Sequence, residues 1–317
     1  MNLLKLFRGK RDAQAPETRA TDVDDARDLA LLKKVRRLEI VSNRIADDAF
    51  CGRYKSVFRG QGVEFDEVRE YAEGDDVRAI DWNVTARAGK AYVKKYAEER
   101  ERTMLVALDV SASNLFGAKQ SRLETATEIA ATLVFSALKS ADRVGLLVFA
   151  DGVCDYFPPR KGKNYALRLV REMLRVKPRR EKANLDAALR FLDKTLKRRA
   201  IVFLLSDFYV QRPGVALNVC RRRHDLVAVS ILEPFESAFP DLGFVSLLDP
   251  ETGATVELDS GSKRVRDAIA ARLKARRDDV AARFKESRVD MIEVVNGEDC
   301  VEPLREFFRR RRLRQAR

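Results

Sequence analysis

The chain has 317 residues, of which 45% are hydrophobic and 35% charged, and its formal net charge at pH 7 is +13. This length and hydrophobic content suffice to bury a sizeable core, which excludes a chain that is disordered throughout. No stretch approaches eighteen consecutive apolar residues, and the apolar core of the start "MNLLKLFRGK" is too short for a secretory signal. We therefore expect a soluble, cytoplasmic protein without stable membrane insertion; contact of the apolar patch at residues 3–8 with a membrane surface is the alternative.

Cysteine, histidine and charge limit the kinds of site. The four cysteines, Cys51, Cys154, Cys220 and Cys300, form no close pair, which argues against a zinc site or a disulfide framework. The single histidine, His224, is a poor basis for catalysis. The positive charge makes acidic proteins, nucleic acid and anionic surfaces all plausible partners, and it does not choose among them.

The first hundred residues divide into a lead and a small module. Residues 1–23 are polar and without period, so we expect a flexible lead. Apolar residues then recur every three or four positions, which predicts a helix of about 25 residues from Asp24; they are Leu31, Val35, Leu38, Val41 and Ile45. The glycine-punctuated stretch up to residue 100 predicts short strands and loops, including an exposed strand around Tyr92 and Tyr96. Residues 24–100 therefore form a helix followed by a small β-rich module.

Residues 101–310 alternate between apolar runs and amphipathic segments. The apolar runs lie at 103–110, 143–150, 200–207, 225–232 and 290–295. Strands that are apolar at every position need cover on both faces, which the amphipathic helical segments between them provide. The pattern predicts an α/β fold with a doubly wound, mostly parallel sheet flanked by helices. A β-hairpin insertion is expected near 244–258, and residues 311–317 form a basic tail.

Polar side chains follow two of the predicted strands. Asp109 ends the first strand, with Ser111 and Ser113 on the next loop, and Asp207 ends a later strand. Open parallel sheets bind ligands at this edge, and clustered carboxylate and hydroxyl oxygens suit Mg²⁺ before Ca²⁺. The alternative is that Asp109 and Asp207 only cap the helices that follow.

The D-x-S-x-S pattern resembles the metal-ion-dependent adhesion site of von Willebrand factor type A domains. The resemblance implies that Asp109, Ser111, Ser113 and Asp207 are metal ligands on a type A fold. The family's threonine ligand corresponds to Ala183, which cannot coordinate a metal, and Asn184 is one position out of register. The resemblance therefore implies a variant site with four of the five ligand positions.

The module upstream carries a second resemblance, to a bacterial family labelled DUF58. Its signature is carried by Glu64, Phe65, Arg69, Glu70, Tyr71, Gly74, Asp75, Arg78, Ile80, Asp81 and Trp82. We interpret the charges around Trp82 as an ion-paired junction that seats the module on the α/β domain, with a partner-binding surface as the rival; Arg53, Arg59 and Arg87 fit either. Members of the family are associated with MoxR-type AAA+ ATPases in chaperone-like assembly or activation of protein complexes.

The leading functional hypothesis is a non-enzymatic adaptor between such an ATPase and a client protein. No P-loop is present, and no nucleophile and base lie close together in the sequence. One alternative is a metal-dependent phosphohydrolase with Asp109 as nucleophile, although Ser111 stands where such enzymes have a second aspartate. The other is binding of nucleic acid or an anionic surface through the arginine-rich C-terminus, which is the less favoured partner class because no base-stacking pattern accompanies it.

Overall fold

The computed structural model describes residues 33, 35–37, 39–40, 63–98, 102–117, 120–179, 181–209, 214–248 and 253–315. The predicted lead at 1–23, most of the predicted N-terminal helix, Cys51, Arg53 and Arg59 lie outside these residues. The described part of that helix is helical. Its Val35 packs into the core, and Glu39 pairs with Lys163 at 2.7 Å, so it lies against the α/β domain.

The elements follow one another in an alternating order. The strands are β1 (Val63–Glu70), β2 (Tyr92–Glu98), β3 (Thr103–Asp109), β4 (Arg143–Phe149), β5 (Val153–Arg160), β6 (Ile201–Ser206), β7 (Asp225–Leu232), β8 (Phe244–Leu248), β9 (Thr255–Asp259) and β10 (Asp290–Val295). The α-helices are α3 (Trp82–Ala88), α4 (Arg122–Lys139), α5 (Lys163–Arg175), α6 (Leu185–Thr195), α7 (Val215–Arg223), α8 (Lys263–Glu286) and α9 (Val301–Gln315). Short 3₁₀ helices are η1 (Val77–Ala79), η2 (Ala112–Leu115) and η3 (Pro234–Glu236).

The central sheet has six strands in the order β10-β7-β6-β3-β4-β5. All neighbouring pairs are parallel except β4 and β5, which run antiparallel. The predicted mostly parallel α/β sheet is therefore confirmed. β5 was not predicted, because Pro158 and Pro159 disfavour a strand. Among the described strands β5 is at the edge of the sheet, and the two prolines lie at a register shift in its pairing with β4, which are the places that tolerate a missing N–H group.

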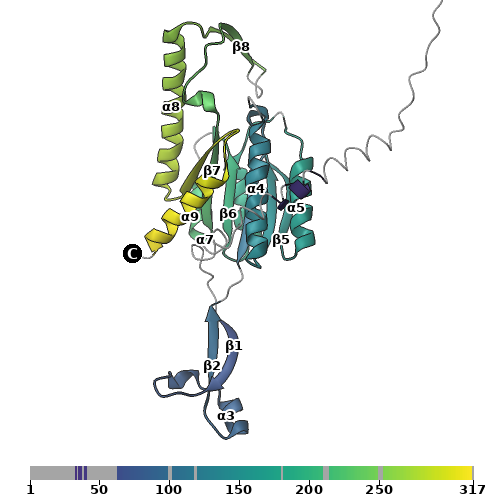
Figure 1. Ribbon diagram of the computed structural model, residues 1–317, viewed down its shortest axis with the longest axis vertical. Helices are drawn as coiled ribbons and strands as arrows, with labels where there is room; N and C mark the ends of the chain where they lie inside the picture. The colour runs from purple at the N-terminus through teal and green to yellow at the C-terminus, as the bar shows by residue number, and fades with distance from the viewer. Residues whose placement is uncertain are drawn as a thin grey trace, which may run out of the picture.

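Helices cover both faces of this sheet (Figure 1). One core cluster joins the strands to α4, α5 and α9, and a second joins them to α6, α7 and α8. Every residue of β6 is buried, as two-sided cover requires. Among the described residues, no helix is both long enough and apolar enough to cross a bilayer.

The β-rich module pairs β1 with β2 in antiparallel register and adds η1 and α3. Helix α3 was expected as loop; Asp81 caps its start by accepting from the amides of Asn83 and Val84, and Gly89 ends it at φ +70°. Figure 1 draws this module below the central sheet. It is a small unit with its own helix.

Two further predictions concern the C-terminal third. The predicted hairpin near 244–258 corresponds to the antiparallel pair β8 and β9. The predicted basic tail at 311–317 is corrected, because α9 continues to Gln315. Arg311, whose side chain is 12% exposed, ion-pairs with Asp225 and Asp290, and Arg314 bonds Asp290 at 3.0 Å. These ion pairs hold the last turns of the helix against the sheet.

We predict that His224 makes stability depend on pH. His224 is buried before β7; its Nδ1 accepts from the Ala200 amide at 3.3 Å, and its Nε2 has no hydrogen-bond partner within the described part of the chain. Burial, with help from Arg223, lowers the pKa of His224. As the pH falls below about 6.5, the unfolded chain binds the proton first, so the free energy of unfolding decreases.

Urea unfolding between pH 7.5 and 5 tests this prediction. The wild type should lose more stability across this interval than His224→Gln, because the variant has no imidazole to protonate and the chain contains no other histidine. Equal pH slopes for the two proteins would contradict the argument.

Candidate functional site

The candidate site lies where the strand order changes direction. From β3 the chain continues to β4 and β5 on one side of the sheet, and then to β6, β7 and β10 on the other. The carboxyl ends of β3 and β6 therefore diverge at a topological switch point, where open α/β sheets bind ligands. Asp109 is the last residue of β3, and Asp207 directly follows β6.

The loop after β3 folds its polar groups onto one another. Asp109 Oδ1 accepts from the Ser111 amide at 2.9 Å, and the hydroxyls of Ser111 and Ser113 lie 3.2 Å apart. Asn114 Nδ2 donates to Ser111 Oγ at 3.3 Å, and its Oδ1 is buried without a hydrogen-bond partner among the described residues. Asp109 and Ser111 are buried, whereas Ser113 is half-buried. The loop thus gathers several side-chain oxygens into one cluster. Solvent reaches this cluster at Ser113, which is only half-buried.

The loop after β6 completes this edge. Ser206 Oγ donates to Asp109 Oδ2 at 2.5 Å and accepts from the Phe208 amide at 3.0 Å. Phe208 adopts φ +54°, which is strained for a residue with a side chain. Its buried ring packs edge-on against Phe284 with centroids 4.7 Å apart, so tertiary packing holds the strained turn. This turn fixes the place of Asp207 beside Asp109.

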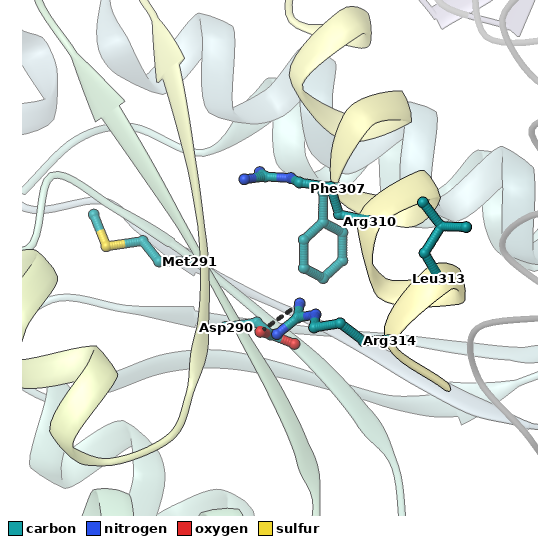
Figure 2. Close-up of a pocket in the computed structure, with 6 residues that line it drawn as sticks. All are labelled: Asp290, Met291, Phe307, Arg310, Leu313 and Arg314. Atoms are coloured by element: carbon teal, nitrogen blue, oxygen red, sulfur yellow. Dashed lines mark hydrogen bonds and ion pairs between the residues drawn. The ribbon is translucent and has the colours of Figure 1, made fainter. Parts of the chain in front are cut away.

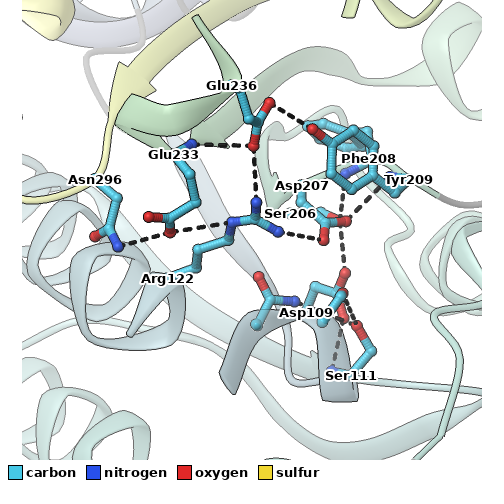
Figure 3. Close-up of polar contacts among 12 residues, drawn as sticks. Asp109, Ser111, Arg122, Ser206, Asp207, Phe208, Tyr209, Glu233, Glu236 and Asn296 are labelled. Carbon is cyan, nitrogen blue, oxygen red and sulfur yellow. Dashed lines mark hydrogen bonds and ion pairs between the residues drawn. The ribbon is translucent and has the colours of Figure 1, made fainter. Parts of the chain in front are cut away.

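Asp207 is bound to a buried arginine that the sequence did not suggest. Arg122, the first residue of α4, places Nη1 3.0 Å from Asp207 Oδ2 and Nη2 2.8 Å from Glu236 Oε1. Its Nε lies 3.3 Å from Glu233 Oε1. Figure 3 shows the guanidinium at the centre of these three carboxylates. The Arg122 cluster, meaning Arg122 with Asp207, Glu233 and Glu236, is almost fully buried.

Further polar groups surround the Arg122 cluster. Tyr209 donates its hydroxyl to Glu236 Oε2 at 2.5 Å, and Asn296 Nδ2 donates to Glu233 Oε1 at 2.8 Å. Glu233 and Asn296 each come directly after a strand, β7 and β10 respectively. Asp109 and Asp207 were found because a polar residue at or directly after the end of a buried parallel strand lies at the ligand-binding edge. The same criterion, applied to every apolar run, would have found Glu233 and Asn296. Arg122 gave no such signal, because charged residues near a helix start are usually solvated.

The electrostatics of this edge favour a cation. Burial, followed by the nearby charge of Asp207, raises the pKa of Asp109 to about 6. Burial also raises the pKa of Glu233 despite Arg122. One guanidinium faces three carboxylates, and Asp109 adds a fourth, so negative charge exceeds positive charge in a buried region.

The donor set fits a hard cation in part. A carboxylate, two hydroxyls and the unpartnered amide oxygen of Asn114 are oxygen ligands of the kind that Mg²⁺ accepts together with water. Within the described ranges, no group of three or more His, Cys, Asp or Glu side chains is placed to hold a metal. An ion would therefore depend on the serine hydroxyls and on water, while Asp207 is shared with Arg122.

The segment expected to supply a threonine ligand does lie beside this loop. Ala112 donates its amide to the Glu181 carbonyl at 3.2 Å, and Asn184 donates its amide to the Ala150 carbonyl at 2.7 Å. Ala183 is half-buried and has no ligand atom. Asn184 Oδ1 accepts from the Ala187 amide at 3.0 Å and so caps α6. Neither residue replaces the missing ligand.

An apolar rim borders the oxygen cluster. Leu115 and Phe116 follow Ser113 on η2 and its C-cap, and they are 48% and 47% exposed. Phe116 packs edge-on against Phe235 of η3, with centroids 5.2 Å apart. Exposed large apolar side chains next to a polar centre are typical of interaction surfaces.

The signature residues of the β-rich module mostly support that module. Arg69 pairs with Asp75 at 2.5 Å, and the Ala72 amide donates to Asp75 at 2.9 Å, across a turn in which Gly74 has φ +108°. The hydrogen bond from Arg69 lowers the pKa of Asp75. Tyr71 donates its amide to the Ala91 carbonyl at 2.9 Å. These contacts explain part of the signature as a local turn.

The other signature residues occupy positions around that turn. Glu64 lies on β1 opposite Ala97, and Arg78 lies in η1, where Asp76 accepts from its amide at 2.9 Å. Asp81 caps α3, and Trp82 begins it with its side chain 68% exposed. Arg87 is exposed in the last turn of α3. These pairings and caps all lie within the module, so the predicted ion-paired junction stays a prediction, as does its rival.

The placement of the site bears on catalysis. Both Asp109 oxygens accept hydrogen bonds, and the side chain is 1% exposed, which is poor access for a nucleophile. His224 precedes β7 and therefore lies at the opposite end of the sheet from the two serines. Nothing in this arrangement indicates a catalytic activity.

We predict that Arg122→Met destabilises the fold. The substitution keeps a long side chain but leaves three buried carboxylates without their shared cation, which should lower the free energy of unfolding by about 3–5 kcal/mol at pH 7. The loss should shrink as the pH falls, because burial raises the pKa of Glu233 and its protonated form no longer needs the cation.

Urea unfolding gives the measurement, with Arg190→Met as the matched control. Arg190 is exposed and pairs at 3.9 Å with Asp186 one helical turn away, so its removal should cost less than about 0.5 kcal/mol. If both substitutions cost the same, the Arg122 cluster does not have the structural role assigned to it.

Comparison with known proteins agrees with the resemblance noted in the sequence. The profile of the family described as "Protein of unknown function DUF58" matches residues 67–279. The uncharacterized protein Rv1480 of Mycobacterium tuberculosis is 30% identical over 263 residues, which cover 81% of each chain. Among solved structures, the conserved hypothetical protein BatB from Bacteroides thetaiotaomicron is similar with a TM-score of 0.43 and 15% identity, covering 66% of this chain and 98% of BatB.

The SpRpn10 VWA domain is similar with a TM-score of 0.38 and 11% identity, covering 64% of this chain and 93% of that domain. Because these TM-scores are below 0.5, the fold is assigned from the strand order of the sheet itself. The profile match spans most of the β-rich module and the α/β domain as far as α8. The chain therefore belongs to the DUF58 family.

Proposed function

We propose that this chain is a non-enzymatic protein-interaction module that presents the carboxyl edge of its sheet to a partner protein. One observation carries the proposal: a buried oxygen cluster with excess negative charge opens at Ser113, directly beside the exposed Leu115 and Phe116. A polar centre supplies directional recognition, and an apolar rim supplies the area that a partner covers.

The proposal includes a divalent cation, Mg²⁺ before Ca²⁺, at the polar centre. Asp109, Ser111 and Ser113 would hold it, with Asp207 nearby on the next strand. When bound, the ion would offer an open coordination position to an acidic side chain of the partner. The chain's own residues would orient that contact, because Ser206 and the Ser111 amide fix the Asp109 carboxylate.

The family resemblance suggests the partner. We propose that the chain works in the cytoplasm with a MoxR-type AAA+ ATPase and couples it to a client protein, in chaperone-like assembly or activation of a complex. The exposed Trp82 of the β-rich module is the candidate for a second contact in this assembly. The phosphohydrolase alternative is less well supported, because the Asp109 carboxylate is buried and Ser111 occupies the position of the second aspartate.

We predict that restoring the missing threonine strengthens Mg²⁺ binding. Ala183→Thr adds a hydroxyl on the segment that lies beside the loop after β3 and should raise the affinity about tenfold, whereas Asp109→Asn should abolish the binding heat. Isothermal titration calorimetry with Mg²⁺ measures both.

Ala187→Thr adds the same hydroxyl in the first turn of α6, four residues after Ala183; it serves as the control and should leave the affinity unchanged. An Asp109→Asn protein that binds Mg²⁺ as well as the wild type would refute this site, and circular dichroism would verify that each variant is folded.

We predict that the carboxyl edge is needed for partner capture. In a pull-down with a MoxR-type ATPase from the same cell, Asp109→Asn and Leu115→Ser should each reduce capture at least about fivefold, because one removes the polar contact and the other part of the apolar rim. Leu242→Ser is the matched control, since Leu242 is 62% exposed and outside the rim. Full capture by both edge variants would mean that this partner binds elsewhere.

A further inference from the structure

The sheet ends at a strand whose outer side is open. β10 pairs with β7 over its full length, from Asp290 opposite Val227 to Val295 opposite Leu232, and no strand in the described ranges pairs with its other side. Half of the backbone groups of an edge strand point away from its neighbour and can bind another extended chain. β10 is therefore a template for one more strand.

β10 lacks the features that usually block an open edge. It contains no proline and no bulge interrupts its register with β7. Its two charged side chains form ion pairs with helices on the two faces of the sheet. Asp290 pairs with Arg314 of α9, and Glu293 pairs with Arg277 of α8 at 2.8 Å. Neither charge is left to repel an incoming strand.

A groove of about 540 Å³ lies between the start of β10 and the last turns of α9. Figure 2 shows Phe307 and Arg314 pointing from α9 toward β10. The lining residues are Asp290, Met291, Phe307, Arg310, Leu313 and Arg314. Leu313 is 55% exposed although it is apolar, and the side chains of Arg310 and Arg314 are 61% and 62% exposed. The groove thus combines an apolar contact with exposed positive charge.

The charge of α9 defines the complementary ligand. The helix contains six arginines and two glutamates, and its last turn carries Arg312 and Arg314. Asp290, the acidic residue of the groove, is already neutralised by Arg311 and Arg314. Arg310 pairs with Glu306 at 3.6 Å, but the arginines of α9 outnumber its glutamates. A ligand here therefore meets net positive charge next to Leu313, which favours alternating acidic and apolar side chains.

We propose that the open edge of β10 and the adjoining groove bind an extended peptide segment of a partner protein, rich in alternating acidic and apolar residues. The segment would add to the sheet through its backbone, place an apolar side chain against Leu313 and set carboxylates against Arg310 and Arg314. The site goes beyond the proposed function, because Asp290 begins β10 and so lies at the opposite end of the sheet from Asp109.

A peptide fits these features better than a nucleic acid does. The one aromatic ring of the groove, Phe307, is 2% exposed and cannot stack on a base. A peptide can hydrogen-bond to a strand edge through its backbone and place an apolar side chain against Leu313. A phosphate backbone can do neither. Single-stranded DNA therefore serves as the competing ligand in the test.

The test uses fluorescence anisotropy with the full chain and a labelled peptide of alternating valine and glutamate. The wild type should bind it, and Leu313→Glu should weaken binding at least about tenfold by replacing an apolar contact with a repelling charge. Leu242→Glu makes the same change at a similarly exposed leucine and should leave the affinity unchanged. Asp109→Asn should also bind normally, which separates this site from the proposed function.

Two further ligands complete the test. The same peptide methylated at every backbone nitrogen keeps its side chains but loses its donors, and it should not bind. Equal binding of the methylated peptide, no effect of Leu313→Glu, or no binding by the wild type would each overturn the proposal. The second ligand is oligothymidylate. If it binds more tightly than the peptide and Leu313→Glu abolishes that binding, the groove is a nucleic-acid site and the proposal is overturned.

Discussion

The ion pairs of Arg122 are the constraint on which the carboxyl edge of the sheet depends. Acidic residues follow β6 and β7, and neighbouring strand ends lie only about 5 Å apart, so Asp207 and Glu233 would repel each other in a region that excludes water. A guanidinium has donors on several sides and contacts both, together with Glu236. The start of α4 is thereby bound to the loops after two strands.

This arrangement is costly in itself. A cation at the start of a helix opposes the helix dipole, and desolvation of four charged groups costs several kcal/mol per ion. Because hydrophobic side chains would fill the same volume without that cost, stability alone does not account for the cluster. Its distinctive property is that it holds the start of α4 and the loops after β6 and β7 together beside Asp109, while leaving an excess of negative charge.

Sequence patterns predicted the fold and the site as far as buried strands reveal them. Strands buried on both faces are apolar at every position, so β3, β4, β6 and β7 stand out, and Asp109 and Asp207 are found from their places at the strand ends. β5 and α3 were missed because local signals conflict with them: paired prolines in the first, and a charged turn around the second. Arg122 was missed because it lies 85 residues from Asp207 in the sequence, and no local pattern indicates that its guanidinium is buried.

The two surfaces proposed for this chain are linked by β10 yet need not influence each other. Asn296, which follows β10, donates to Glu233 in the Arg122 cluster, while Asp290 at the start of β10 lines the groove. Coupling between sites requires an element with two arrangements that both ligands bias. β10 is paired with β7 throughout its length and packed by helices on both faces, so within the described residues it has the character of a fixed spacer. A fixed spacer suits an adaptor, because it can hold one partner at each end of the sheet without either partner displacing the other.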